Sequence, residues 1–455
     1  MTCSLREKIL QYDWAVPRYT SYPVAPYFQG VDSDTPYQEW LRAIPEGETL
    51  SLYIHIPYCK ELCWYCGCNT KITKKYAPVE KYLNLIRREI IMLSELCKDT
   101  HKVTHIHFGG GSPSIVTPDD FASLMELISR SFHIDENAEI AMEIDPRGLN
   151  DARVDVYAKH GVNRVSLGIQ DFDKTVQQAI NRPQSAALVK LVMDKLQARG
   201  IHNINFDLIY GLPHQNLQTA KDTFDRVIEF NPKRIAYFGY AHVPWMKKHM
   251  RLIDEGALPD TELRFDLFQY GAERLEQAGY HAIGIDHFAR SDDELFFALQ
   301  EKRLRRNFQG YTSDKADHLI GIGVSSIGYV QDHHVQNTPD MPVYNKSIMG
   351  GELAVRKYCA SSQDDMLRRA VIEQLMCYFT VDLPAICAQY GVEPTYFDAE
   401  YQALLPYMKQ GFVDMDEQNI LTIKPEAKAI ARIICSVFDA YLAPIEGQKR
   451  HSKAI

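Results

Sequence analysis

From residue 49 to about residue 290, short apolar runs alternate with longer segments whose apolar residues recur at helical spacing. Repeated strand and helix in this order predicts a parallel sheet covered by helices. The connections are long enough for βα units, so we expect an open or closed β/α barrel rather than a doubly wound sheet. Strands are predicted at about 50–57, 103–108, 138–144, 164–170, 202–210, 234–241 and 280–286, and helices at segments such as 79–96, 118–132 and 217–230.

The two ends of the chain have different patterns. Residues 1–48 form a leader rich in proline and tyrosine with little periodicity. From about residue 361, helical segments are followed by a probable hairpin, Phe412–Asp416 and Ile420–Ile423, and by a helix from Pro425 to Leu442. We therefore predict three parts: an N-terminal leader (1–48), a barrel (49–360) and a small, mostly helical, winged-helix-like domain (361–455).

The C-terminal domain is expected to be a cover rather than a DNA-binding module. Winged-helix domains usually bind DNA, but acidic residues outnumber basic ones from 361 to 455. We therefore expect this domain to cover the mouth of the barrel.

Polar residues and glycines follow the predicted strands at the points where they end. Buried polar groups are costly, and β/α barrels build their active sites at the C-terminal ends of their strands. We therefore expect one site at this end of the barrel. Its candidate residues are His55, the glycines 109–111, Glu143, Gln170, Asp207 and the turn Tyr240-Ala241-His242.

The first predicted strand has two different faces. Leu52, Ile54 and Ile56 alternate with Tyr53 and His55, and successive side chains of a strand point to opposite sides. The aliphatic face should pack against helices, while Tyr53 and His55 should face the barrel interior. From the strand alone, a buried structural role for His55 remains the alternative to a role in the site.

Four of the ten cysteines lie within ten residues, and Cys59, Cys63 and Cys66 have the spacing Cys-x3-Cys-x2-Cys. Three thiolates on so short a loop can reach three corners of a [4Fe–4S] cube, which leaves one iron open. A structural zinc ion usually takes two separated ligand pairs, and a disulfide framework needs an oxidising compartment. We therefore predict an iron–sulfur cluster.

Composition limits the partners. The 455 residues are 45% hydrophobic and 24% charged, and the formal net charge of −9 argues against nucleic acid as the main partner. The N-terminus has no apolar signal-like region, and no apolar run approaches the length of a membrane span. The other cysteines are scattered through apolar stretches. We expect a cytoplasmic monomer without a membrane or nucleic-acid partner.

The Tyr-x-His-x-Pro lead-in and the cysteine spacing resemble the radical S-adenosylmethionine (SAM) superfamily. The fuller string, with Cys68 after Gly67, resembles the oxygen-independent coproporphyrinogen III oxidases, and matching segments extend over nearly the whole chain. The resemblance implies a partial (β/α)6 barrel. It also implies an oxidoreductase of haem biosynthesis that uses 5′-deoxyadenosyl radical chemistry. Such an enzyme converts two propionates of coproporphyrinogen III to vinyl groups, giving protoporphyrinogen IX, with an electron donor and acceptor that the sequence does not identify.

The same resemblance assigns residues. Cys59, Cys63 and Cys66 would hold the [4Fe–4S] cluster, whose fourth iron binds SAM. Catalytic roles fall to Tyr53, also a cofactor contact, and to His55. The glycine run with Gly110 and Gly111 would bind the amino group of SAM, and Glu143 would hold a SAM ribose. A second SAM would contact Gln170, Arg182, Asp207 and Ala241, together with the backbone near Tyr65 and the Gly111-Ser112 turn. Phe308 and Gln309 belong to a segment near this second SAM, and Ile327 would contact an adenine.

The sequence also offers alternatives for individual residues and for the function. Without the resemblance, Arg182 and Asp207 would be expected to form salt bridges at the barrel rim. Arg18, Arg147 and Arg290 are the candidates to meet the substrate's propionates, and the role of Cys68 is open. Other possible functions are a radical SAM enzyme with a different substrate and a haem-binding trafficking protein on the same scaffold. The trafficking relatives typically lack a cysteine at position 68 and the segment Asn307–Thr312, and this chain has both.

Overall fold

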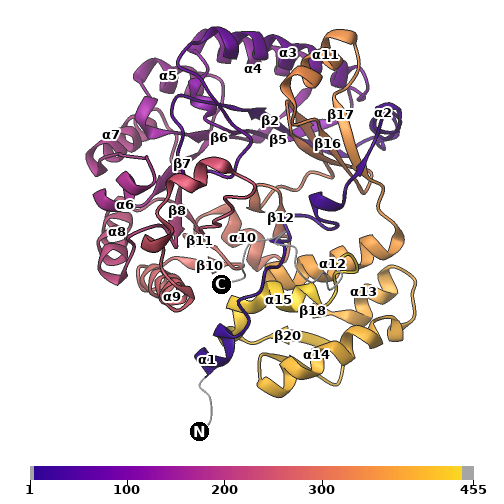
Figure 1. The fold of residues 1–455 in the computed structure, drawn as a ribbon. Helices are drawn as coiled ribbons and strands as arrows, with labels where there is room; N and C mark the ends of the chain where they lie inside the picture. The colour runs from indigo at the N-terminus through magenta and orange to yellow at the C-terminus, as the bar shows by residue number, and fades with distance from the viewer. Residues whose placement is uncertain (1–4, 443–455) are drawn as a thin grey trace.

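A mixed sheet of 13 strands organises the computed structural model, which describes residues 5–442 (Figure 1). Seven neighbouring strands in its centre run parallel. In spatial order they are β14 (His318–Ile322), β2 (Thr49–Ile56), β5 (Lys102–Gly110), β6 (His133–Ile144), β7 (Arg164–Gln170), β8 (Asn203–Tyr210) and β9 (Arg234–Gly239).

From β2 to β9 the chain alternates strand and helix, as the periodicity predicts, and the helices form an outer layer around the sheet (Figure 1). This is the partial α/β barrel expected from the sequence. Its helices are α3 (Ala77–Ser94), α4 (Pro118–Ser131), α5 (Asp151–Lys159), α6 (Lys174–Ala179), α7 (Ala186–Gln197) and α8 (Leu217–Phe230).

The prediction of a single strand over 280–286 is wrong. Two short antiparallel strands occupy this region, β10 (His281–Ile283) and β11 (His287–Ala289), and β11 pairs with β9. The chain turns between them at Gly284, whose φ of +56° is a conformation that glycine adopts easily. A Cβ at Gly284 would lie 2.0 Å from the ring of Tyr311, so the turn is also tightly packed.

Antiparallel strands extend the sheet beyond β14. The strands on this side are β15 (Ile327–Val330), β16 (His333–Asn337), β17 (Val355–Cys359) and β1 (Gln29–Gly30). The other elements are α2 (Thr35–Arg42), β3 (Tyr58–Cys59), β4 (Lys71–Ile72), α9 (Thr261–Gln277), α10 (Glu294–Gln300), β12 (Arg305–Asn307), β13 (Gly310–Thr312) and α11 (Met341–Gly350).

The alternation in β2 has the predicted consequence. Leu52, Ile54 and Ile56 are fully buried in the main hydrophobic cluster, together with side chains of α3. Tyr53 and His55 lie on the opposite face of the strand and contact each other and the end of β5. Apolar packing against the helices therefore fixes which side chains face the barrel interior.

The C-terminal region has the winged-helix order of elements. It consists of α12 (Gln363–Tyr378), β18 (Thr380–Asp382), α13 (Leu383–Gln389), α14 (Asp398–Gln410), β19 (Val413–Met415), β20 (Ile420–Ile423) and α15 (Ala431–Ser436). The predicted hairpin is confirmed as β19–β20, which β18 joins in a three-stranded sheet.

The single helix predicted over Pro425–Leu442 is wrong. A 3-10 helix, η7 (Pro425–Ile430), precedes the shorter α15. Ala427 and Ile430 are both buried, and residues three apart share one face of a 3-10 helix. The tighter turn therefore places both side chains in the core.

The leader is divided between two cores. Its first part contributes Ile9, Tyr12, Val16, Tyr19 and Tyr22 to the hydrophobic cluster of the C-terminal region, whereas α2 packs into the barrel cluster. The Tyr19 hydroxyl also donates to Asp439 (3.1 Å).

The domain division at 48/49 and 360/361 stays a prediction, and residues 1–4 and 443–455 of its outer parts lie outside the described residues. Within residues 5–442, no helix is both long enough and apolar enough to cross a membrane.

Glu89 of α3 makes the free energy of unfolding depend on pH. The buried carboxylate accepts hydrogen bonds from the Gly323 amide (2.7 Å), the Tyr344 hydroxyl (2.6 Å) and the Asn337 amide (2.6 Å). Burial raises its pKa from 4.5 to about 7. The native state therefore binds a proton more tightly than the unfolded chain, so this group lowers the free energy of unfolding as pH rises from about 4.5 to 7.

We predict that Glu89→Gln flattens the pH dependence of stability, because the amide does not titrate. Chemical denaturation between pH 5 and 8 should show a smaller fall in the free energy of unfolding than in the parent protein. The exposed Glu126→Gln should keep the parent slope. An unchanged slope in Glu89→Gln would contradict this account.

Candidate active site at the barrel mouth

The cysteine loop follows β2 and is fixed to the end of β5. Gly111 donates to the Ile56 carbonyl (2.8 Å), and Ser112 donates to that of Tyr58 (2.9 Å). Within the loop, the Cys66 amide donates to the Cys63 carbonyl (3.2 Å). Cys63 is buried, whereas Cys59 and Cys66 are partly exposed. The three predicted cluster ligands therefore lie on one loop at the end of the barrel.

Two arginines direct their guanidinium groups at Cys63. Its sulfur lies 3.4 Å from Arg182 Nη1 and 3.7 Å from Arg147 Nη2. Asp145 holds both arginines, with its Oδ2 2.7 Å from Arg147 Nη2 and 3.5 Å from Arg182 Nη1. Nearby positive charge favours a thiolate, which is the form of cysteine that binds metal.

The other two cysteines differ from each other. A hydrogen bond from Cys68 lowers the pKa of Cys66 to about 6. Burial, together with the neighbouring Cys66 and Cys63, raises the pKa of Cys59 to about 12. Cys68 therefore neighbours a predicted ligand, and its own role stays a question for experiment.

The loop suits a cluster better than a single ion. Within residues 5–442, no three His, Cys, Asp or Glu side chains converge closely enough to hold one metal ion. A four-iron cube binds a separate thiolate at each corner, so its cysteines are held apart. Three cysteines on one loop, two of them partly exposed and one beside two guanidinium groups, fit such a cube.

Inside the barrel, the Glu143 carboxylate at the end of β6 already accepts hydrogen bonds from two neighbours. Its Oε2 accepts from the Gly110 amide (3.1 Å), and its Oε1 lies 3.2 Å from His107 Nε2. Burial alone would raise the pKa of Glu143, but the bonds from His107 and Gly110 outweigh it and lower the pKa. The side chain keeps 39% of its surface exposed, so an ionised carboxylate is open to a ligand.

Tyr53 and His55 form a pair whose protons can be assigned. His55 Nε2 lies 3.2 Å from the Asn69 carbonyl, which can only accept, so this nitrogen carries the hydrogen. Burial lowers the pKa of His55, which favours the neutral ring. His55 Nδ1 then accepts the hydroxyl hydrogen of Tyr53 at 3.1 Å.

The glycine run at the end of β5 is sterically required. A Cβ at Gly110, where φ is +112°, would lie 2.5 Å from the His55 ring. A Cβ at Gly111 would lie 2.9 Å from the backbone of Pro57 and Tyr58. These glycines let β5 pass directly beneath the cysteine loop. Whether they also contact SAM stays a prediction.

Arg182 and Asp207 are both at the barrel mouth but have different partners. Arg182 Nη2 donates to the Gly168 carbonyl (2.7 Å), and its ion pair is with Asp145. Asp207 accepts from Ser166 Oγ and Asn205 Nδ2, each at 2.7 Å, and burial raises its pKa to about 6. An ion pair therefore explains part of the position of Arg182 but not that of Asp207.

The remaining predicted residues lie in three neighbourhoods. Tyr65 packs in the small apolar cluster that contains Tyr240. Phe308 contacts the ring of Phe28 in the leader and the ring of His334 in β16. The others lie at strand ends or nearby: Ser112 beside Ser114, buried Gln170 at the end of β7, Ala241 after β9, Gln309 between β12 and β13, and Ile327 at the start of β15.

The sequence did not reveal the residues that hold the candidate site residues in position. Asp145 holds Arg147 and Arg182, His107 holds Glu143, and Asn69 holds His55 through its carbonyl. His107 and Asp145 lie two residues from strand-end candidates, and this spacing is a usable signal. Nothing in the sequence marks the Asn69 carbonyl.

Comparison with known proteins agrees with this geometry. Residues 53–227 match the model of the radical SAM superfamily. The oxygen-independent coproporphyrinogen III oxidase of Bradyrhizobium diazoefficiens is 45% identical over 440 residues, 97% of each chain. The enzyme of the same name from Escherichia coli K12 is 36% identical over 448 residues, 98% of this chain and 97% of the relative.

The chain belongs to the oxygen-independent coproporphyrinogen III oxidase family. A solved structure of coproporphyrinogen III oxidase from Escherichia coli, described as a radical SAM enzyme, superimposes with a TM-score of 0.89 at 36% identity. It covers 93% of this chain and 98% of its own. Membership of the radical SAM superfamily implies SAM and a [4Fe–4S] cluster as cofactors.

We predict that Gly110→Ala disrupts the site, because the added Cβ strikes the His55 ring and the backbone conformation suits only glycine. The melting temperature should fall, and SAM binding to the reconstituted protein should weaken at least tenfold in equilibrium dialysis. Gly350→Ala is the matched control, since no atom lies within 4 Å of its added Cβ. Equal SAM affinity in both variants would rule out this role of the glycine.

Proposed function

We propose that the protein carries out the anaerobic oxidative decarboxylation of two propionates of coproporphyrinogen III, giving protoporphyrinogen IX. The observation that carries this proposal is the full-length similarity to relatives named for that activity. The structure supports it with a cysteine loop, an ionised Glu143 and an interior Tyr53–His55 pair at one end of a barrel.

The cysteines and the strand ends would hold the cofactors. Cys59, Cys63 and Cys66 would bind the cluster, and the guanidinium groups of Arg147 and Arg182 would lie beside the Cys63 ligand. Glu143 would accept the ribose hydroxyls of SAM, since a carboxylate has acceptor sites for both. When bound, the cluster would supply an electron, and SAM would supply the radical that removes a hydrogen atom from a propionate. The second SAM would contact Gln170, Arg182, Asp207 and Ala241, together with the backbone near Tyr65 and the Gly111-Ser112 turn.

Tyr53 and His55 would act together. His55 fixes the Tyr53 hydroxyl by accepting its hydrogen, and the Asn69 carbonyl fixes His55 in turn. Burial raises the pKa of Tyr53, so the phenol stays protonated at neutral pH. We propose that Tyr53 is the catalytic contact and that His55 sets its orientation.

The leader and the C-terminal region would enclose the site. They share one hydrophobic cluster, so they can move as one unit over the barrel mouth and exclude water and oxidants. The protein would act as a monomer in the cytoplasm, with an electron donor and an acceptor still to be identified.

Anaerobic reconstitution tests the activity. Protein supplied with iron, sulfide, SAM, a reductant and coproporphyrinogen III should form 5′-deoxyadenosine and a product that has lost two carboxyl groups, identified by mass spectrometry. Deoxyadenosine without decarboxylation would leave the superfamily in place but exclude this substrate. Tight stoichiometric haem binding without turnover would favour a trafficking protein.

The ligand assignment has a separate test. Cys59→Ala should lose the iron, the acid-labile sulfide and the visible absorption of the reconstituted cluster. Cys97→Ala changes a partly buried cysteine at the end of α3 and should keep the parental iron content. A full cluster in Cys59→Ala would show that another residue is the ligand.

A further inference from the structure

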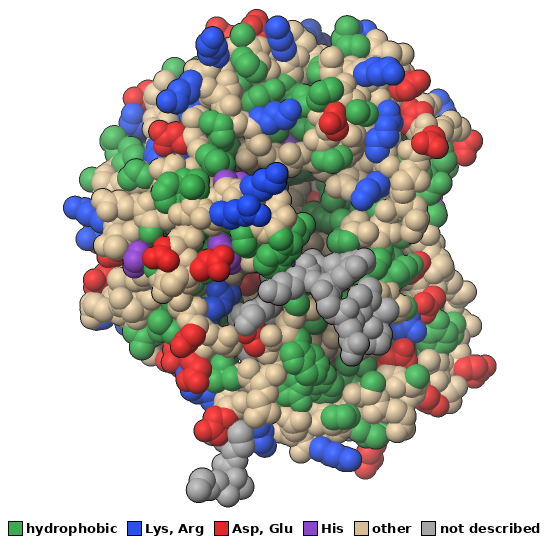
Figure 2. Space-filling model, viewed as in Figure 1, with side chains coloured by type: hydrophobic (Ala, Val, Ile, Leu, Met, Phe, Trp, Pro, Cys, Tyr) green, Lys and Arg blue, Asp and Glu red, His purple; other side chains and the backbone are tan. Residues whose placement is uncertain are grey.

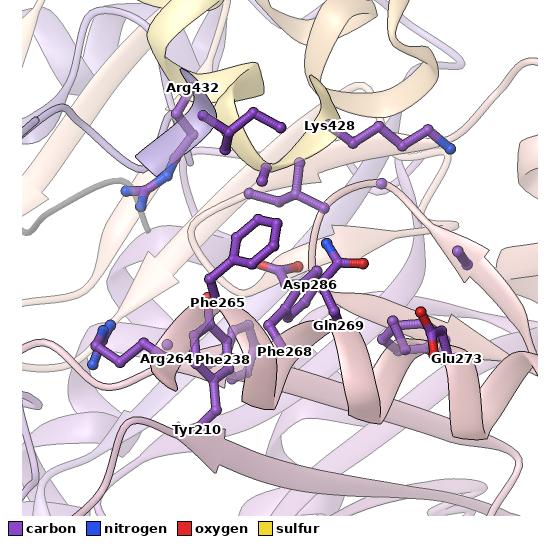
Figure 3. Close-up of a pocket in the computed structure, with 18 of the residues that line it drawn as sticks. Tyr210, Phe238, Arg264, Phe265, Phe268, Gln269, Glu273, Asp286, Lys428 and Arg432 are labelled. Atoms are coloured by element: carbon purple, nitrogen blue, oxygen red, sulfur yellow. The ribbon is translucent and has the colours of Figure 1, made fainter. Parts of the chain in front are cut away.

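A cavity of about 550 Å³ lies beside the barrel mouth, outside the groups assigned to SAM and the cluster. Its walls come from α9, the end of β9, the Gly284–Asp286 turn, the leader and the C-terminal region. Figure 3 shows Phe265 and Phe268 in the middle of the cavity, above Tyr210. The rings of Tyr210, Phe265 and Phe268 therefore form an apolar part of the cavity wall.

Arginines from four separate segments meet in this cavity. They are Arg18 of the leader, Arg264 of α9, Arg306 of β12 and Arg432 of α15. Arg264 and Arg432 lie toward the same end in Figure 3, whereas Glu273 and Lys428 lie toward the other. The full lining has six cations, with Arg6 and Lys428 added to these four, against the four acids Glu273, Glu276, Asp286 and Glu426.

The arginines are close enough to repel one another. Burial, together with the charges of Arg18 and Arg306, lowers the pKa of Arg432 to about 10. Burial also lowers the pKa of Arg18, with further contributions from Arg306 and Arg264. Asp286 opposes this repulsion and lies 3.5 Å from Arg306 Nη2. Like charges held together in a cavity favour the binding of anions.

Two glycines of the backbone leave space for the Arg264 side chain. A Cβ at Gly211, where φ is +84°, would lie 2.0 Å from Arg264 Nη1, and a Cβ at Gly239 would lie 3.3 Å from its Nη2. The guanidinium also lies over the Tyr210 ring, 5.6 Å from its centroid. Two glycines at the ends of β8 and β9 thus make room for this cation.

We infer that the cavity binds the propionates of the porphyrinogen that are not reacting, through Arg18, Arg264 and Arg432. The inference rests on the proposed function. Guanidinium groups match carboxylates in shape and charge, and the apolar macrocycle would pack on the aromatic rings. Tyr210, Gly239 and Tyr240 of the lining end two strands of the barrel, so the opposite edge of the macrocycle would reach the barrel mouth.

The other two arginine candidates lie elsewhere. Arg147 is held by Asp145 beside Cys63. Arg290 donates to the Ala278 carbonyl (2.6 Å) and lies over the Tyr280 ring, 3.9 Å from its centroid. Arg18 donates to the Gly239 carbonyl (3.0 Å) and lines the cavity. Arg18 and Arg290 therefore form a matched pair for a test.

Binding to the reconstituted holoenzyme tests the inference. The probes are coproporphyrin III, the stable aromatic form with four carboxylates, and its tetramethyl ester, each titrated anaerobically by fluorescence. Arg18→Gln and Arg432→Gln should each weaken binding of the acid about tenfold, the effect of losing one charge-assisted hydrogen bond. Arg290→Gln should stay within about twofold of the parent, and the ester should bind all four proteins equally weakly.

The outcomes separate the inference from the proposed function. Parental affinity for the acid in both cavity variants would overturn the inference, even if the parent protein decarboxylates coproporphyrinogen III. A parent protein that binds no porphyrin and shows no turnover would overturn both. Thermal unfolding checks that each variant is folded, and Arg18→Gln decides the matter if Arg432→Gln is unstable, because Arg18 is the more solvent-exposed of the two residues.

Discussion

The parallel register of β2, β5 and β6 is the constraint on which the site depends. It sets His55 opposite Gly109 and Ile56 opposite Gly110, so the glycine run lies directly beside the first residues of the cysteine loop. The same register lets the Gly110 amide reach Glu143 on the next strand. Because the strands run in one direction, every candidate group at a strand end meets at one edge of the sheet. The positions of the cysteine loop, of the Glu143 carboxylate and of the Tyr53–His55 pair follow from this arrangement.

Much of the fold could be predicted because it depends on local periodicity. Alternation in β2 predicted its buried and interior faces. Short apolar runs predicted the other strands up to β9, and apolar residues at helical spacing predicted the helices between them. The errors occur where a single residue or a distant partner decides. Gly284 turns the chain within an apolar run, and η7 replaces part of an expected helix because of packing. The leader's place in the C-terminal core joins segments more than 350 residues apart, which periodicity does not reveal.

The site shows the same limit. Residue types with obvious chemistry, such as the three cysteines and Glu143, could be placed from motif and resemblance. Their partners could not, because Asp145 reaches Arg182 and the Asn69 carbonyl reaches His55 only after the strands are aligned. The cavity arginines come from four segments, and each one alone resembles a solvated surface residue. Their common position emerges only from the packing of the leader and the C-terminal region against the barrel.

We propose above that this barrel mouth directs radical chemistry to the propionate side chains of a porphyrinogen. Coproporphyrinogen III carrying deuterium at the propionate β-carbons is the decisive substrate, with the reaction run anaerobically and the products analysed by mass spectrometry. Deuterium should appear in the 5′-deoxyadenosine, and the product should lack two carboxyl groups. Unlabelled 5′-deoxyadenosine, formed while the porphyrinogen keeps all its deuterium and all four carboxyl groups, would contradict the proposal.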